Sequence, residues 1–334
     1  DVVGLDTLVH VANGLYEGCP NDEAHDLFKL PDFISKMIEN KWLGSKSGQG
    51  FYKKVGKEIL SLDLNTLEYR AAKKASFATL ELTKTIEKPI DRFKVLVKGK
   101  DKAGEFYRKS FAAMFAYCSN RIPEISDDFY KIDDAMKAGF GWENGPFEIW
   151  DAIGVENAIE LMKAEGYTPA AWVKDMLASG NSTFYSVKNG ATHYYNSTSK
   201  SQEKVPGQDA FIILDNIRES HKVWGNSDAS IIDLGDGILN LEFHSKMNTI
   251  GGGVLAGINK AIDLAEKEYR GLVIGNQGAN FTVGANIGMI FMMAVEQEYD
   301  ELNMAIKYFQ DTMMRVRYSS IPVIVAPHGM TLGG

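Results

Sequence analysis

Backbone amides at one turn are the part of this sequence best suited to chemistry. Gly284 and Ala285, in the run NFTVGANIG, stand where a strand and a loop give way to a helix expected near Asn286. N–H groups at a helix start can point into a cleft, and such fixed dipoles stabilise negative charge on a carbonyl oxygen. A glycine turn that caps an ordinary helix would give the same run, so this segment alone leaves a structural role open.

Other glycine-rich runs lack the context that phosphate binding requires. GFGWENG at 139–145 follows a helix, without the preceding strand and later acidic residue of a dinucleotide fingerprint. Gly99 and Gly104 have P-loop spacing, but Glu105 stands where the loop needs Lys. The glycines at 251–253 could open a helix towards an anion, although they also suit a flexible helix start. The six histidines have no metal-ligand spacing, so we expect no metal site.

Helices are expected to position these groups over most of the first 188 residues. Apolar residues recur at helical spacing in Asp6–Leu15 and Pro31–Asn40, and a glycine-rich loop, KWLGSKSGQGFY, follows at 41–52. The same spacing predicts helices at Thr66–Ile86, Lys102–Asn120, Ser126–Lys137, Val155–Glu165 and Pro169–Ala178. In GPFEIW, Phe147 and Trp150 are expected to be core aromatics.

A partial internal repeat connects the two ends of this helical part. At an offset of 150, DVVGLDTLVHVANGLYEG (1–18) matches DAIGVENAIELMKAEG (151–166), including Asp1 with Asp151. Residues 31–52 match 169–185 more loosely, and each stretch ends in a Phe-Tyr pair. The repeat predicts a duplicated helical domain whose first copy lacks its amino end. Two unrelated helices that share an apolar period remain the alternative.

The pattern changes after about residue 189, where a polar stretch with Pro and Gly predicts a linker or loose hairpin. Strands are then expected at 231–234, 237–243, 269–274 and 321–325, with an amphipathic helix at 251–268. Strands that alternate with helices indicate an α/β unit with parallel pairing.

Composition excludes several classes of partner. Lys and Arg number 36 against 44 Asp and Glu, a net charge of −8, which argues against nucleic acid or an anionic membrane as the main partner. The apolar stretches 287–295 and 321–326 are far shorter than the about 20 residues of a membrane span. Cys19 and Cys118 form neither a disulfide framework nor a zinc motif, so we expect a reducing, cytoplasmic location.

Longer motifs carry a resemblance to known enzymes. NRIPEISDDFYKIDDAMKAGFGWENGPFEIWDAIG (120–154) resembles the carboxy-terminal helical domain of 3-hydroxyacyl-CoA dehydrogenases, as does GLDTLVHVANGLYEG (4–18) followed by KWLGSKSGQGFY. KMNTI (246–250), NFTVGANIG (280–288) and PVIVAPHGMTLGG (322–334) resemble the start of a crotonase, or enoyl-CoA hydratase, domain. This order resembles fused enzymes of fatty-acid β-oxidation that carry both activities.

The resemblance implies a multidomain chain, with tandem all-α dehydrogenase carboxy-terminal domains followed by a truncated α/β crotonase-like domain. The expected division is a first helical domain at 1–56, a connecting helix and linker at 57–95, and a second helical domain at 96–188. A linker at 189–225 and the crotonase-like domain at 226–334 complete it. We expect the chain to be an inactive segment of a longer enzyme.

The resemblance also implies site residues. The Ala285 amide would be one oxyanion donor to an acyl-CoA thioester, and Gly334 is favoured for the second. Asn286 replaces the usual Asp of the family's GAD, which keeps a capping oxygen without its charge. Asn120 matches a family Asn that contacts the substrate carbonyl or the catalytic histidine, but it lies in the second copy, where a structural remnant is the alternative.

The remaining expectations follow from this family. NAD would be bound by a domain outside this chain, the hydratase glutamates would follow Gly334, and the substrate would be a coenzyme A thioester. A homodimer and a separate thiolase are the expected protein partners. The alternative is a noncatalytic helical module for dimerisation or interdomain docking, with a degenerate acyl-CoA-binding crotonase piece.

Overall fold

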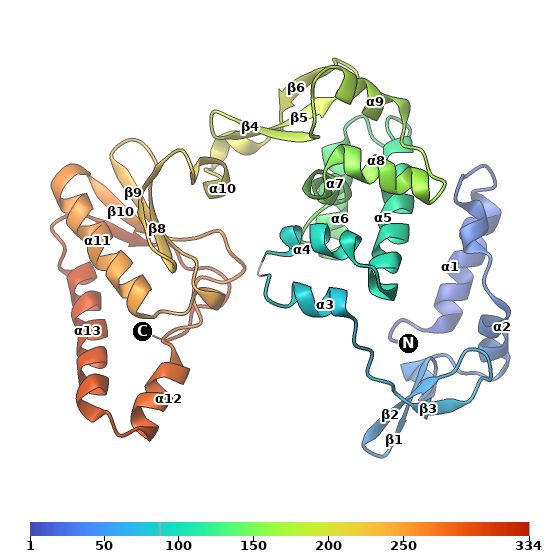
Figure 1. Cartoon of the computed structure of the whole chain (residues 1–334), viewed down its shortest axis with the longest axis horizontal. Helices are drawn as coiled ribbons and strands as arrows, with labels where there is room; N and C mark the ends of the chain where they lie inside the picture. Colours follow the sequence, from blue (N-terminus) through green and yellow to red (C-terminus); the bar gives the residue numbers. More distant parts are fainter. Residues whose placement is uncertain (87, 334) are drawn as a thin grey trace. The chain divides into compact units, whose positions relative to one another are not determined.

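The computed structural model describes residues 1–86 and 88–333, and the chain divides into two compact units. Unit 1 comprises Asp1–Tyr185 and Tyr195–Gln202, and unit 2 holds the rest. Within the described residues, no helix is long and apolar enough to cross a membrane. Figure 1 labels the helices and strands of both units.

Unit 1 is mainly helical, and most of its helices lie where the apolar spacing predicts them. α5 spans the predicted range, Lys102–Asn120, because the Asp101 side chain caps it by accepting the Gly104 N–H at 3.0 Å. The sequence pattern missed α7. The helices are α1 (Leu5–Gly18), α2 (Asp32–Glu39), α3 (Ala78–Thr83), α4 (Pro89–Lys98), α5, α6 (Phe129–Phe140), α7 (Pro146–Ile153), α8 (Val155–Ala164) and α9 (Ala171–Ala178).

Aromatic side chains form the core of the α5–α9 region. Phe147 and Trp150 on α7 are fully buried, as expected for core residues. The Trp150 ring stacks on Phe115 of α5 at 5.0 Å and meets Phe184 edge-on at 4.8 Å. These contacts fix α7 against α5 and against the chain that follows α9.

Two small sheets correct the expectation of all-α domains. One contains β1 (Tyr52–Val55), β2 (Glu58–Leu62) and β3 (Tyr69–Ala71), in antiparallel order. The other has the order β4 (Tyr185–Lys188), β5 (Ala191–Asn196), β6 (Ser201–Lys204). Each sheet begins at the Phe-Tyr pair that ends a repeat.

The prediction of a long helix at Thr66–Ile86 is wrong. β3 and an irregular stretch occupy residues 69–77, and only the short α3 follows. Tyr69 donates its hydroxyl to the Gly50 carbonyl at 2.7 Å and packs on Trp42. These partners lie far away in sequence, and they hold this segment as a strand in spite of its local apolar period.

Matched hydrogen bonds support the duplication that the sequence predicts. The Asp1 carboxylate accepts the N–H groups of Phe51 and Tyr52, both at 2.9 Å. The Asp151 carboxylate accepts those of the Phe-Tyr pair at 184–185, at 2.8 and 2.9 Å. Gly4 and Gly154, three residues after each Asp, have φ of 108° and 98°. The duplication of the domain stays a prediction that these matched contacts support. We call residues 1–71 repeat 1 and residues 96–185 repeat 2.

Unit 2 is built on a five-stranded sheet of order β11-β10-β9-β8-β7. Parallel pairing, as expected, joins β9 (Ile238–Phe243), β10 (Gly271–Ile274) and β11 (Val323–Val325). The other two strands, β7 (Lys222–Gly225) and β8 (Ala229–Asp233), are antiparallel. The helices are the short α10 (Leu214–Ile217), α11 (Gly252–Glu268), α12 (Ile287–Val295) and α13 (Tyr299–Arg317).

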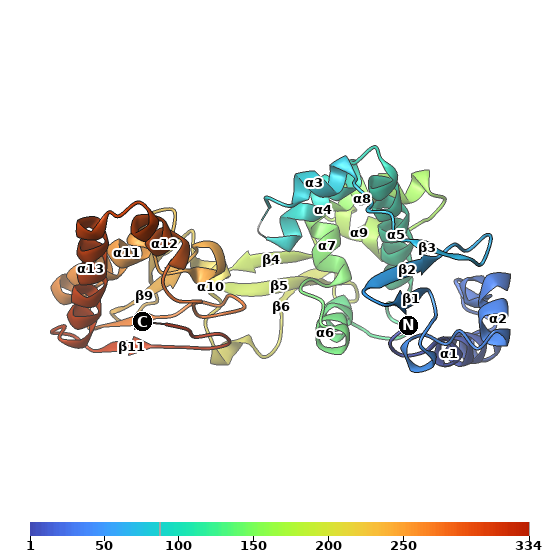
Figure 2. The ribbon, with the colours of Figure 1, turned by 90° about the horizontal axis from the view of Figure 1, so that it is seen from below.

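Helices cover the sheet of unit 2 on both faces. α11 packs against β8, β9 and β10, and α13 packs on α11. Neighbouring residues of β8 divide between the faces: Ile231 joins the core under α11, and Ile232 packs with Leu214 and Ile217 of α10. Figure 2 shows α11, α12 and α13 together on one side of the strands.

Candidate functional site

Three chain segments of unit 2 meet at the predicted amide turn. Ile250, before α11, forms a parallel bridge with Ala285, donating its N–H to the Gly284 carbonyl at 2.8 Å. Thr282 forms a second parallel bridge with Thr331, near the end of the described chain. The turn is therefore held between the start of α11 and the segment that follows β11.

Gly284 has to be glycine for this meeting to occur. Its φ is +88°, in a region that L side chains rarely adopt. A Cβ there would lie 2.6 Å from the Leu332 carbonyl oxygen and 3.3 Å from the Gly333 Cα. The close approach brings the NFTVGANIG run next to Leu332 and Gly333.

The Ala285 N–H is placed to donate to a ligand. In this bridge, Ile250 donates its N–H to the Gly284 carbonyl and accepts the Asn286 N–H. The amide of Ala285, between them, therefore faces away from Ile250. Ala285 is partly exposed, and no acceptor within residues 1–86 and 88–333 bonds its N–H. Directly after it, the Asn286 side chain accepts the Met289 N–H at 3.1 Å and caps α12, so the helix dipole lies behind the turn.

An apolar cavity of about 340 Å³ opens beside this amide. Ala285, Asn286 and Gly333 contribute to its wall, with the glycines that begin α11. Hydrophobic side chains form most of the remaining lining, from α11 (Leu255), α12 (Met289, Ile290) and α13 (Leu302, Ala305, Ile306, Phe309). A small apolar cavity with a few directed polar groups is the usual form of a small-molecule site.

Gly334 is the other residue predicted for this site. Gly334, the favoured second donor, lies outside the described residues, while its neighbour Gly333 lines the cavity. Glu296 and Glu298 are exposed and are not part of the cavity wall. The α13 residues were missed by sequence reasoning, although their helical apolar spacing was a usable signal.

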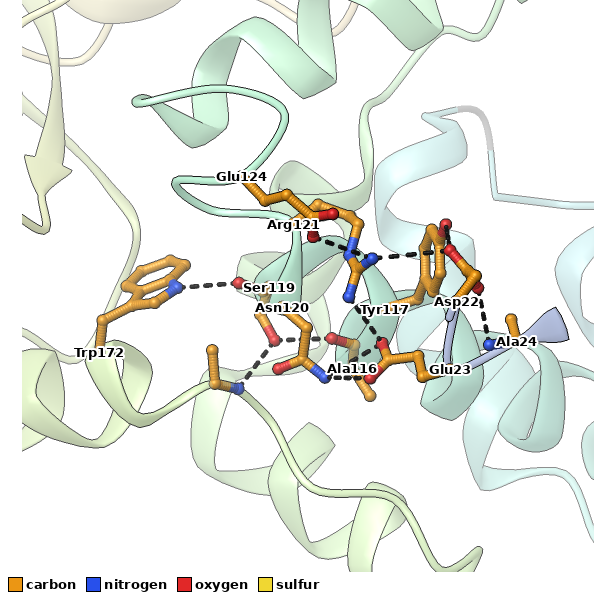
Figure 3. A network of polar contacts seen from close by, with 11 residues as sticks. Asp22, Glu23, Ala24, Ala116, Tyr117, Ser119, Asn120, Arg121, Glu124 and Trp172 are labelled. Carbon is orange, nitrogen blue, oxygen red and sulfur yellow. Dashed lines mark hydrogen bonds and ion pairs between the residues drawn. The ribbon is translucent and has the colours of Figure 1, made fainter. Parts of the chain in front are cut away.

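Asn120 lies in unit 1, in a separate network (Figure 3). Its side-chain amide donates to both carboxylate oxygens of Glu23, at 3.1 and 3.0 Å. The Arg121 guanidinium pairs with Glu124 at 3.0 Å, Glu23 at 3.5 Å and Asp22 at 3.6 Å. The end of α5 in repeat 2 thus binds the acidic pair at residues 22–23 of repeat 1.

Hydrogen bonding favours the charged form of Asp22 in this pair. The Ala24 N–H and the Tyr117 hydroxyl, at 2.7 and 2.8 Å, lower the pKa of Asp22, helped by the charge of Arg121. Burial and the hydrogen bond to Asp22 raise the pKa of Tyr117. Sequence reasoning did not single out Asp22 and Glu23, although they lie in a stretch, 19–30, that has no counterpart in the second repeat.

At the centre of repeat 2, a carboxylate is buried among aromatic rings. Asp133 is fully buried and accepts the Phe147 and Glu148 N–H groups at 2.9 and 3.1 Å and the Tyr185 hydroxyl at 2.8 Å. Burial raises its pKa to about 7. Because all its contacts are internal to the fold, this carboxylate holds the start of α7.

The sequence of this chain is similar to sequences of known proteins. The family model described as "3-hydroxyacyl-CoA dehydrogenase, C-terminal domain" matches residues 1–54. A probable 3-hydroxyacyl-CoA dehydrogenase of Bacillus subtilis (strain 168) is 44% identical over 335 residues, which cover 100% of this chain and 42% of that protein. A putative fatty acid oxidation complex trifunctional enzyme of Rickettsia felis is 24% identical, covering 100% of this chain and 42% of that protein.

Among solved structures, an enoyl-CoA hydratase from Thermoplasma volcanium GSS1 aligns at 28% identity with a TM-score of 0.26, covering 31% of this chain and 41% of that one. The chain spans 42% of the length of both curated relatives. It is therefore similar along its whole length to a probable 3-hydroxyacyl-CoA dehydrogenase, and its first residues match the carboxy-terminal domain of that enzyme family.

Proposed function

We propose that the chain is a segment of a fatty-acid β-oxidation enzyme that joins 3-hydroxyacyl-CoA dehydrogenase and enoyl-CoA hydratase activities. The helical domains at 1–56 and 96–188 belong to the dehydrogenase, and 226–334 is the first part of the crotonase-like domain. The similarity over the whole chain to a dehydrogenase and to a trifunctional enzyme supports this assignment.

The observation that carries the hydratase part is the Ala285 amide beside the apolar cavity. Addition of water to an enoyl thioester gives a transition state with negative charge on the thioester oxygen. An N–H fixed at the start of α12 stabilises that charge more than it stabilises the uncharged substrate. The cavity wall would hold the acyl part, and the amide following Gly333 would provide the second donor.

The proton-transfer groups of the hydratase are assigned to the rest of the domain. Hydration needs a carboxylate near the β carbon, and Glu296 and Glu298 are exposed on the outside of the cavity. In this proposal the segment supplies charge stabilisation and acyl binding, and the complete domain supplies the acid and base. The segment alone is expected to lack hydratase activity.

The described residues do not fit NAD. In unit 2, the glycines of α11 follow the long connection 244–251 instead of the tight strand-to-helix turn of a dinucleotide site. We therefore assign NAD to a separate domain of the full-length enzyme and derive no hydride-transfer step from this chain. A cytoplasmic location, a homodimer and a thiolase partner complete the proposal.

A second candidate is a noncatalytic role in interdomain docking for the helical repeats. It is favoured by one observation: Asn120 and Arg121 of repeat 2 bind the carboxylates of repeat 1. This role is compatible with catalysis elsewhere in the full-length enzyme.

The test of the hydratase assignment is Ala285→Pro in the full-length protein, assayed with a short enoyl-CoA. Proline removes one N–H donor, and loss of an oxyanion donor typically lowers kcat by about 100-fold to 1,000-fold. Ile287→Pro is the matched control, because position 287 is the first residue of α12, where proline is tolerated, and lies outside the cavity wall. Full hydratase activity in a folded Ala285→Pro protein would remove this amide from the mechanism.

A further inference from the structure

The two repeats differ in the connection between their paired helices. α1 and α2 are joined by residues 19–31, and the corresponding helices α8 and α9 are joined by only 165–170. The extra chain in repeat 1, residues 19–30, includes a 3-10 turn at His25–Phe28 and is named here the acidic loop. Its sequence, CPNDEAHDLFKL, carries three carboxylates.

The acidic loop is attached to its own repeat. His25 stacks on Tyr16 of α1 at 4.0 Å, and its Nδ1 lies 3.1 Å from the Cys19 carbonyl oxygen. The Ala24 N–H bonds the Asp22 carboxylate at 2.7 Å. These contacts preorganise the loop, so that a bond made by Asp22 or Glu23 restrains α1 as well.

The end of α5 in repeat 2 is complementary to this loop in charge and geometry. Asn120 donates to both oxygens of Glu23, and Tyr117 donates its hydroxyl to Asp22 at 2.8 Å. Arg121, whose side chain is only 17% exposed, lies over the Tyr117 ring at 4.8 Å and faces both carboxylates (Figure 3). Partly buried pairs of this kind are screened less by water and salt than surface pairs.

A cavity of about 780 Å³ depends on the same contact. One side is formed by the acidic loop (Glu23, Ala24, Asp26, Leu27 and Phe28), and α5, between Ala113 and Asn120, forms another. Gly166, Tyr167 and Thr168, between α8 and α9, complete the lining. The contact residues Glu23, Tyr117 and Asn120 therefore also line this cavity.

We propose that the acidic loop is a latch that fixes repeat 1 to repeat 2, with Asn120 and Arg121 as its positioning residues. The latch uses Asn120, which matches the Asn that the family resemblance assigns to contact with the substrate carbonyl or the catalytic histidine. An amide bound to both oxygens of Glu23 has its donors committed to the loop. The inference concerns how the two repeats are held and does not depend on the proposed hydratase activity.

The test is hydrogen exchange of this chain after Glu23→Ala, Asn120→Ala and the double substitution. Each single change should speed exchange of amides in 19–30 by about tenfold, since a charge-assisted bond is lost. The double change should add little, because both singles remove the same contact. Glu105→Ala is the matched control: it breaks an exposed pair with Lys109 on the same helix and should leave the loop unchanged.

Two further measurements keep the result interpretable. Asn120→Gln retains the amide donor and should recover part of the protection, and the melting temperature of each variant shows whether it is folded. Unchanged loop exchange in a folded Asn120→Ala protein, or fully additive effects in the double variant, would overturn the latch. Loss of acetoacetyl-CoA binding without a change in loop exchange would overturn it too, and would make Asn120 a ligand contact.

Discussion

Replacement of Trp150 by alanine tests the aromatic core on which repeat 2 depends. The side chain is fully buried, stacks on Phe115 and donates its indole N–H to the Val155 carbonyl at 3.2 Å. Truncation of a buried aromatic to alanine costs about 3–5 kcal/mol. This cost is a large part of the free energy of unfolding of a typical domain, about 5–15 kcal/mol.

The two contributions can be separated by a second variant. Trp150→Phe keeps most of the ring and removes the N–H donor, which leaves the Val155 carbonyl without that partner, at a cost of about 1–3 kcal/mol. With an m value of about 2–3 kcal/mol/M, a loss of 4 kcal/mol lowers the urea midpoint by about 1.3–2 M.

The assay should follow repeat 2 alone, because two units need not unfold together. Hydrogen exchange of α5 peptides in increasing urea reports the opening free energy of that region. Phe106→Ala, an aromatic residue of α5 that is 64% exposed, is the control and should cost far less. Equal effects of Trp150→Ala and Phe106→Ala would refute the core assignment, and lost acyl-CoA binding with unchanged stability would make Trp150 a ligand contact.

Three other changes probe buried charge and close packing. Arg218→Ala should destabilise unit 2 by about 3–5 kcal/mol, because it leaves the buried Glu242, which is 4% exposed, without its bidentate partner. Urea unfolding measures this cost, and a value under 1 kcal/mol would contradict the prediction. Gly145→Ala should lower the melting temperature, since its Cβ would lie 2.3 Å from the Asp133 Cβ, whereas Gly139→Ala, with open space, should be neutral or stabilising. Burial raises the pKa of Asp133 to about 7, so the folded state binds a proton that the unfolded state releases near pH 4, and stability should fall as pH rises from about 4 to 7. Asp133→Asn should make that decline shallower, and an unchanged slope would show that Asp133 is ionised throughout.

Local pattern was sufficient for several elements. α5 matches its predicted bounds because an apolar period and a capping Asp101 are both written in consecutive residues. In unit 2, β8 to β11 and the helix α11 lie within a few residues of their expected positions for the same reason, whereas β7 and α13 were not predicted. The duplication stays a prediction; of the positions it matched, Asp1 and Asp151 each bind the Phe-Tyr pair that follows in the same segment.

Other features depend on partners that are distant in sequence. The apolar period at Thr66–Ile86 favours a helix locally, but pairing of β3 with β2 decides its structure. The α7 helix was missed because it is short and apolar on most sides, and only burial between α5 and α6 distinguishes it.

The sequence by itself predicted which residues would form the amide turn, and the tertiary structure decided which chain segments meet there. Gly284 shows the reason: its positive φ is suggested by residue type, but its approach to Leu332 requires the chain to close over α12, α13 and β11. The contact of Asn120 with Glu23 likewise spans 97 positions. A periodic pattern encodes which face of a segment is buried, whereas the identity of the opposing surface is set by packing of the whole unit.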